Sequence, residues 1–208
     1  MRRDFLFEDA FAVYNSFQNF DATRKFKIVF IDANGMEEIG IDAGGLFKEF
    51  MTKLTEKIFD PQLALFEENE VDRKHYPNFL SAYEDPENFR HYYHFSGMIV
   101  GKALYEGVLL KCRFARFFLN KVVSKSNQVD DLKAVDQQLY ENLMQVKYYE
   151  DSPVEDLGLT MTVAQDVFGD SREIELLPNG ANVPVNNENR LLYVILYANW
   201  LLNGRMRE

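Results

Sequence analysis

Cys112 has the most direct capacity for covalent chemistry, because it is the only thiol in the 208 residues. It lies between Lys111 and Arg113, and neighbouring cations favour the nucleophilic thiolate by lowering the pKa of a thiol. No histidine lies near it in sequence to act as a base, and Leu110 and Phe114 indicate a packed loop. Isolated cysteines are mostly small buried hydrophobes, so we favour that interpretation. An enzyme that depends on Cys112 is the alternative.

Glu87, His91 and His94 have the helical spacing that could place three metal ligands on one face. A zinc site would also need a fourth ligand and supporting hydrogen bonds, and neither is visible in the sequence. The neighbours are aromatic, and His75 stands alone. We therefore favour histidines that pack in the interior, and expect no metal and no cofactor.

The stretch from Gly40 to Phe50 joins a β-branched run at 27–31 to an apolar pattern of helical period. A glycine turn before a helix can bind phosphate, because backbone N–H groups at a helix N-terminus attract anions. The spacings of the known phosphate loops are missing, and Asp42 would repel a phosphate. We predict a strand, a tight turn in which Asp42 caps the helix, and the helix itself.

Composition limits the classes of function that are possible. The chain is 47% hydrophobic and 14% aromatic, which is typical of an ordered globular protein. Its net charge of −10 disfavours nucleic acid and anionic membranes as partners, since both require a basic face. No apolar run is long enough for a membrane helix, and the first ten residues carry acids where a signal peptide is apolar. We expect a cytoplasmic or nuclear protein without disulfides.

In the first two thirds of the chain we predict mainly helices. They cover residues 4–17, the glycine stretch to 59, where Asp60-Pro61 ends the helix, and residues 88–106 and 114–124. Strands are expected at 26–31, 63–66 and near 76. The helix at 88–106 is apolar nearly all round and should be buried, and Gly97 and Gly101 should let another helix approach closely.

After Tyr149 the pattern changes from helical to strand period. Before that point, short helices are expected near 130 and at 136–146. Extended segments then follow at 157–163, 174–177 and 183–185, and a final helix at 191–203 is capped by Asn187. The predicted fold class is α+β and mainly helical, with a large helical subdomain at residues 1–138 and a small mixed α/β subdomain at 139–208.

The small subdomain is strongly acidic. Between residues 139 and 185 there are nine acidic and two basic residues, so this stretch holds −7 of the net charge of −10. An acidic surface with apolar residues in it suits a basic protein partner. An ordinary solvated face over a small core would have the same composition.

Four motifs, in the same order along the chain, resemble one family. Residues Gly40 to Phe50 resemble the G-x-D-x-G-G-x-x-[KR]-E-[FW] signature of HECT-type ubiquitin ligases. Residues Arg2 to Ala10 are similar to the family's opening helix, Phe95 to Glu106 to its central F-x-G-x-x-x-G-x-A-[LIV]-Y helix, and Asn187 to Arg190 to its N-x-N-[RK] element. Together they cover only the N-terminal lobe of a HECT domain.

The resemblance implies a function. The small subdomain would dock a ubiquitin-loaded conjugating enzyme, so that ubiquitin passes by transthiolation to a cysteine on a C-terminal lobe that is not in this chain. The intact parent would be a ubiquitin-protein transferase, and this chain alone would be inactive. The family's conjugating-enzyme groove falls on six residues here: Leu139, Leu143, Tyr149, Leu157, Leu159 and Tyr193.

The resemblance also implies a second, weak partner site. Some members bind ubiquitin on the large subdomain, in the region of Tyr76 to Asn78. Where this chain has Tyr193 the family often has phenylalanine, which would change the depth of the groove and the choice of partner. Apart from the resemblance, a protein-interaction scaffold without a role in ubiquitin transfer is the other alternative.

Overall fold

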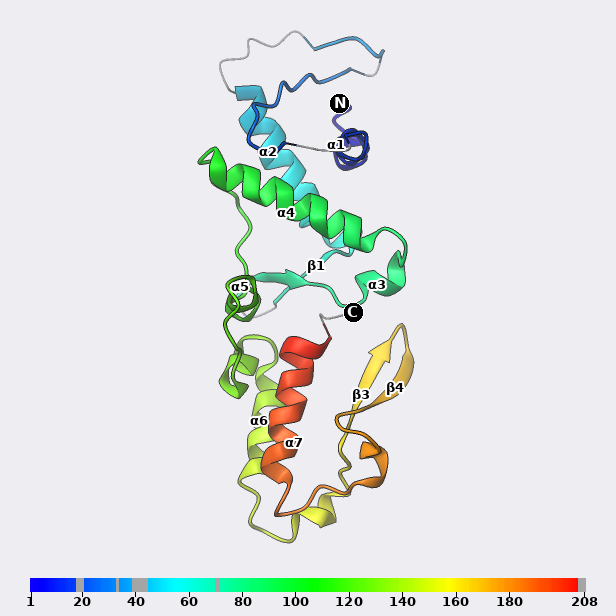
Figure 1. Ribbon diagram of the computed structural model, residues 1–208, viewed down its shortest axis with the longest axis vertical. Helices are drawn as coiled ribbons and strands as arrows, with labels where there is room; N and C mark the ends of the chain where they lie inside the picture. The colour runs from blue at the N-terminus through cyan, green and yellow to red at the C-terminus, as the bar shows by residue number, and fades with distance from the viewer. Residues whose placement is uncertain (18–20, 33, 39–44, 70–71, 206–208) are drawn as a thin grey trace. The chain divides into compact units, whose positions relative to one another are not determined.

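The computed structural model describes residues 1–17, 21–32, 34–38, 45–69 and 72–205. Helices predominate in it, together with two antiparallel sheets of two strands each, which confirms the α+β, mainly helical fold class (Figure 1). The chain divides into two compact units. The first contains residues 1–68 and 74–113, and the second contains residues 69–73 and 114–208. The division predicted at 138/139 stays a prediction.

Three helices form the core of the first unit: α1 (Leu6–Asn15), α2 (Gly45–Ile58) and α4 (Phe89–Tyr105). Each packs against the other two. Aromatic rings join α1 to α4, with the Phe11 and Tyr92 centroids 4.7 Å apart and those of Phe7 and Phe95 5.7 Å apart. The predicted helices therefore form, and apolar burial holds them together.

The segment at 26–31 was predicted as a strand, and this was wrong in detail. Ile31 forms only isolated bridges, with Arg2 and with Glu37. The segment is nevertheless an inner part of the unit, since Ile28 and Phe30 are buried. Its partner on one side is the short stretch before α1, where the Ile31 N–H donates to the Met1 carbonyl at 3.0 Å. Only Arg2 in that stretch forms a bridge with Ile31, so no continuous ladder develops.

The connection into α2 lies mostly outside the described residues, and with it the predicted cap at Asp42. At the other end, α2 stops at Ile58 as predicted. The carboxylate of Asp60 accepts from the Gln62 N–H at 3.0 Å and so begins a 3-10 turn, η1 (Pro61–Leu63). The antiparallel strands β1 (Phe66–Glu68) and β2 (His75–Pro77) follow, and then the short helix α3 (Ser81–Glu84).

Helix α4 is buried on one face only, which corrects the prediction that it is buried on nearly all sides. Its buried residues include Phe95, Ile99 and Ala103, whereas Leu104 is 76% exposed. A Cβ added to Gly97 or Gly101 would meet nothing within 4 Å. The apolar residues on the outer face misled the prediction, because hydrophobicity shows which side chains could be buried, while packing decides which of them are.

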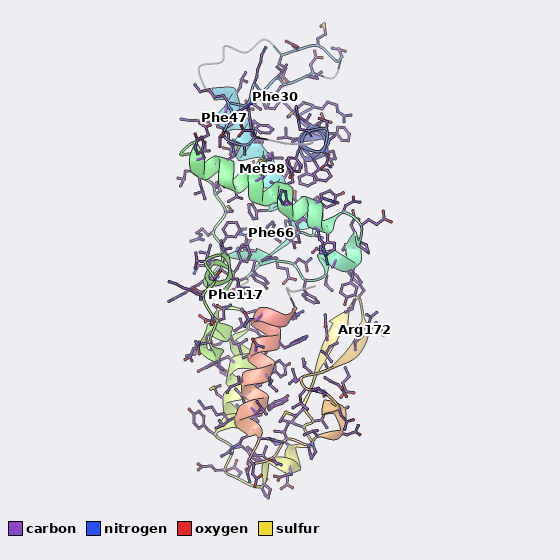
Figure 2. All side chains as sticks on the ribbon, viewed as in Figure 1. Phe30, Phe47, Phe66, Met98, Phe117 and Arg172 are labelled. Atoms are coloured by element: carbon purple, nitrogen blue, oxygen red, sulfur yellow. The ribbon has the colours of Figure 1, made fainter. Side chains whose placement is uncertain are left out.

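The second unit begins with α5 (Arg116–Val122), the 3-10 segment η2 (Val129–Ala134) and α6 (Gln137–Lys147). Helix α7 (Arg190–Asn199) continues into a π-helical turn, η5 (Trp200–Gly204). Helices α6 and α7 lie side by side, and η2 contacts α5, α6 and α7 (Figure 1). The buried side chains Phe117, which Figure 2 labels, and Leu132 belong to this core.

A β-hairpin completes the second unit. Strands β3 (Thr162–Val167) and β4 (Asp170–Glu175) pair from Thr162↔Glu175 to Val167↔Asp170. The extended pieces were therefore predicted out of position: β3 begins later than expected, because Leu157 ends a 3-10 turn, η3 (Val154–Leu157), and β4 ends before Leu176. Another 3-10 turn, η4 (Gly180–Asn182), precedes a single bridge between Thr160 and Pro184.

Among the described residues, no helix has both the length and the apolar character that a membrane crossing requires.

Candidate partner-binding site

Three of the six predicted groove residues lie on the paired helices of the second unit. Leu139 and Leu143 are on α6, and Tyr193 is on α7. Helix α6 starts where the sequence indicated, because the Asp136 carboxylate accepts from the Leu139 N–H at 2.9 Å. The Tyr193 ring meets the Tyr197 ring edge to face, with centroids 5.8 Å apart. Packing of α6 on α7 therefore places these three residues in one part of the unit.

Tyr149 follows α6 and is tied to α7 by a charged side chain. The Arg190 guanidinium donates to the Tyr149 carbonyl at 2.6 Å. The Tyr149 hydroxyl lies 3.2 Å from Ser152 Oγ. Arg190 thus fixes the beginning of the acidic loop to the first turn of the last helix.

Leu157 and Leu159 are on the other side of that loop. Leu157 ends η3, and the Leu159 carbonyl accepts from the Val185 N–H at 2.8 Å. The side chain of Asn189 holds this region to α7, since its amide donates to the Pro184 carbonyl at 2.9 Å. Asn189 and Arg190, which are consecutive residues of the N-x-N-[RK] element, therefore connect both flanks of the predicted groove to α7.

Asn189 also replaces Asn187 at the start of the last helix, which corrects the predicted cap. Asn189 occupies the N-cap position, and its side chain makes no capping hydrogen bond to the helix. Its carboxamide oxygen instead accepts from the Asn186 N–H at 2.8 Å. The side chain therefore binds the backbone of the segment just before the helix, and a sequence pattern alone cannot distinguish that use from a helix cap.

Exposure separates the six predicted residues. Leu143 and Tyr193 are buried, at 3% and 5% exposed, and burial raises the pKa of Tyr193 to about 12. Leu139, Tyr149 and Leu159 are half-buried, and Leu157 is 38% exposed. Glu155 and Asp156, next to Leu157, are both exposed. A partner could therefore reach the loop residues directly, while Leu143 and Tyr193 lie beneath the surface.

Sequence reasoning missed several exposed apolar residues of the second unit. Tyr148, Leu191 and Ile195 are at least half exposed, and Leu192 is 47% exposed. Leu191, Leu192 and Ile195 lie on α7, for which the sequence predicted a helix but no exposed face. A further one, Phe168, lies in the turn between β3 and β4 and is 61% exposed. Its signal was the Phe-Gly pair between two alternating segments.

The candidate chemical residues are in the first unit. Cys112 is half-buried, and burial raises the pKa of its thiol, which opposes formation of a thiolate. His94 Nδ1 is hydrogen-bonded to the Tyr14 hydroxyl, but His91 and His94 are both exposed, which corrects the prediction that they pack in the interior. No group of three metal-binding side chains occurs among the described residues. In the region of the predicted ubiquitin site, the Asn78 amide donates to the Ala64 carbonyl at 2.9 Å.

Comparison with known proteins places the chain in a family. Residues 52–208 match the model of the HECT domain (ubiquitin-transferase), and the chain belongs to this family. It is 40% identical to a probable E3 ubiquitin protein ligase of Schizosaccharomyces pombe, over 99% of the chain. It is 36% identical to the E3 ubiquitin-protein ligase UPL6 of Arabidopsis thaliana and 33% identical to ubiquitin-protein ligase E3B of Homo sapiens, each over 100% of the chain.

The chain is much shorter than these relatives. It spans 20% of the length of each of the three. The names of the relatives describe ubiquitin-protein ligases as whole proteins, whereas the matched region is one part of each.

Proposed function

We propose that this chain is the part of a HECT ubiquitin-protein ligase that recruits a ubiquitin-loaded conjugating enzyme. Ubiquitin would then pass by transthiolation to a cysteine on a C-terminal lobe outside this chain, and from there to a substrate. Membership of the HECT family supports the role in ubiquitin transfer. The observation that carries the choice of surface is Leu157, an exposed leucine next to two exposed acids in the second unit.

The docking surface is the loop side of the second unit. Leu157 would contact an apolar side chain of the conjugating enzyme, with Leu139, Tyr149 and Leu159 around it. Leu143 and Tyr193 would support this surface from below, because both are buried. Glu155 and Asp156 would face basic residues at the rim, where charges influence the rate of encounter more than the lifetime of the complex.

The chain itself supplies no nucleophile in this proposal. Cys112 is half-buried with a raised pKa, so little of it is thiolate near neutral pH. When a ubiquitin-loaded conjugating enzyme is added, we expect no ubiquitin thioester on this chain. Electrophoresis without and with reductant measures this. A reducible band shifted by one ubiquitin, and absent from Cys112→Ala, would support the Cys112-dependent enzyme instead.

Calorimetric titration against a panel of ubiquitin-conjugating enzymes tests the docking surface. We expect Leu157→Ala to weaken binding by about 1–2 kcal/mol, within the usual range for an apolar contact at the centre of an interface. The exposed leucine should leave the thermal stability nearly unchanged. Arg116→Ala, an exposed change on α5, is the control and should alter neither quantity.

Leu143→Ala distinguishes a supporting residue from a contact residue. Because Leu143 is 3% exposed, its truncation should cost about 2–4 kcal/mol of folding stability. Any loss of affinity should then follow the loss of stability. If folded Leu157→Ala binds every responsive enzyme as tightly as the parent chain, the docking surface is misplaced. If no enzyme binds the parent chain at all, the scaffold alternative is favoured.

A further inference from the structure

At the tip of the β3–β4 hairpin, a bulky residue adopts a backbone conformation that is rare for its type. Val167 pairs with Asp170, so Phe168 and Gly169 form a two-residue turn. Both have positive φ, +54° for Phe168 and +84° for Gly169. A two-residue turn with both central φ angles positive is of type I′, which strongly favours Asn-Gly, Asp-Gly or Gly-Gly. A bulky aromatic residue in the left-handed region is a genuine outlier.

Packing within the unit does not compensate for this conformation. Phe168 is 61% exposed, whereas Val163 and Val167 on the preceding strand are buried. The Phe168 ring stacks on no other ring and faces no cation among the described residues. The ring is therefore mostly exposed, at a turn position that favours asparagine. A strained backbone that carries an exposed aromatic side chain is a reason to look for a function.

The surroundings of Phe168 indicate the chemistry of what binds it. The hairpin carries four acidic residues and one basic residue, Asp166, Asp170, Glu173 and Glu175 against Arg172. Arg172, labelled on β4 in Figure 2, lies 3.3 Å from the Asp170 carboxylate. The exposed tip of the hairpin thus presents an apolar ring among negatively charged side chains. A complementary partner has an apolar pocket with lysines or arginines at its rim.

We propose that Phe168 is an anchor that inserts into such a pocket on the ubiquitin-conjugating enzyme. The inference rests on the proposed function and adds to it a second contact, separate from Leu157. Docking of Phe168 onto the first unit of its own chain lacks this complementarity, because residues 1–68 and 74–113 also carry more acids than bases. Aromatic residues are enriched among those that dominate binding, since they bury a large area with few rotatable bonds.

Phe168→Asn is the decisive variant, because it separates binding from folding. The change creates Asn-Gly, the preferred pair for this turn, so the midpoint of thermal unfolding should rise by about 2–5 °C. In the same protein, affinity for the responsive conjugating enzymes should fall about tenfold. A residue with a merely structural role would move both quantities in the same direction.

Ser124→Gly is the matched control. Ser124 is also exposed and also left-handed, with φ of +57°, but it follows α5. Relief of its conformation should raise stability without changing affinity. Glu173→Lys tests the charge part of the inference: it should slow association and reduce its dependence on salt.

The possible results separate the inference from the function on which it rests. Unchanged affinity of Phe168→Asn for an enzyme that binds the parent chain overturns the inference and leaves the docking function standing. A fall in thermal stability makes Phe168 a structural residue and also overturns the inference. If Phe168→Asn weakens binding of free ubiquitin but not of the unloaded enzyme, the occupant is ubiquitin and the assignment is wrong. If the parent chain binds no conjugating enzyme, both proposals fail.

Discussion

Lys102 shows how one buried charge connects segments of the first unit. Its side chain is fully buried on α4, yet its ammonium makes two hydrogen bonds, and such bonds are the condition under which proteins tolerate a buried charge. The ammonium donates to the Arg24 carbonyl at 2.8 Å and to the Glu106 carboxylate at 2.6 Å. It also lies 4.7 Å from the centre of the Phe26 ring. Lys102 therefore holds the segment before Ile28 onto the central helix.

Replacement of Lys102 by methionine tests this role. Methionine retains the apolar stem but loses both hydrogen bonds, so we expect a loss of about 1.5–3 kcal/mol in the free energy of unfolding. Lys111→Met is the control, because Lys111 is 77% exposed and its ion pair with Glu56 should contribute less than about 1 kcal/mol. Urea denaturation of both variants measures the difference. Equal stabilities would show that Lys102 contributes no more than a surface lysine.

Arg3 gives the first unit a dependence on pH. Its guanidinium lies 2.8 Å from the Glu38 carboxylate, also binds Glu49, and lowers the pKa of Glu38. A carboxyl group whose pKa is lower in the folded state than in the unfolded state stabilises the fold at pH values above its unfolded pKa of about 4.3. This stabilisation is lost as the pH falls through the pKa of the folded state. Arg3→Gln should therefore lower the melting temperature at pH 7, and by less at pH 3. A constant difference from pH 7 to pH 3 would contradict the assignment.

At the scale of elements, two glycines illustrate opposite constraints. A Cβ on Gly180 in η4 would lie 2.3 Å from the Met161 carbonyl oxygen, so the backbone would have to move. A Cβ on Gly101 in α4 would meet nothing within 4 Å. Close approach of η4 to the start of β3 therefore requires glycine, whereas α4 tolerates a side chain.

The two alanine variants should accordingly change stability in opposite directions. We expect Gly180→Ala to destabilise by about 1–3 kcal/mol, the usual cost of forcing atoms into a packed site. Gly101→Ala should stabilise by about 0.5–1 kcal/mol, because alanine is the better helix former. Thermal denaturation followed by circular dichroism checks both signs. A destabilising Gly101→Ala would indicate that another element does approach this face of α4.

At the scale of the whole molecule, charge is the property most relevant to partners. The chain carries −10, and both compact units hold more acids than bases. A negative field attracts basic proteins over distances of about 10 Å at moderate salt. If the proposed partner is a basic conjugating enzyme, association should therefore be fast at low salt and slower as salt is added.

The double variant Glu155→Lys with Asp156→Lys tests the location of this steering. If these exposed acids lie at the rim of the docking surface, the association rate should fall several-fold while the dissociation rate changes little. The salt dependence of association should fall as well. Stopped-flow kinetics at several salt concentrations measures both. An effect confined to dissociation would place the two acids inside the interface.

The sequence by itself determined the fold class, most helices and the family. Helical periodicity located α2, α4, α6 and α7 within a few residues, because apolar spacing is a local property of the chain. The motifs that indicated the HECT family are also local, and the match over residues 52–208 confirms the family. Among the described residues, the strand at 26–31 was wrong because a ladder depends on a partner distant in sequence.

The tertiary structure alone decided which residues are accessible. Leu143 and Leu157 have identical side chains, yet one is 3% and the other 38% exposed, because Leu143 is on α6, which packs on α7, whereas Leu157 ends the short turn η3. The side chains of Asn189 and Arg190 are a second example. Their sequence suggested the start of a helix, but in the structure they bind the carbonyls of two loops. Burial and long-range hydrogen bonds depend on neighbours that the chain acquires only on folding, so no local pattern encodes them.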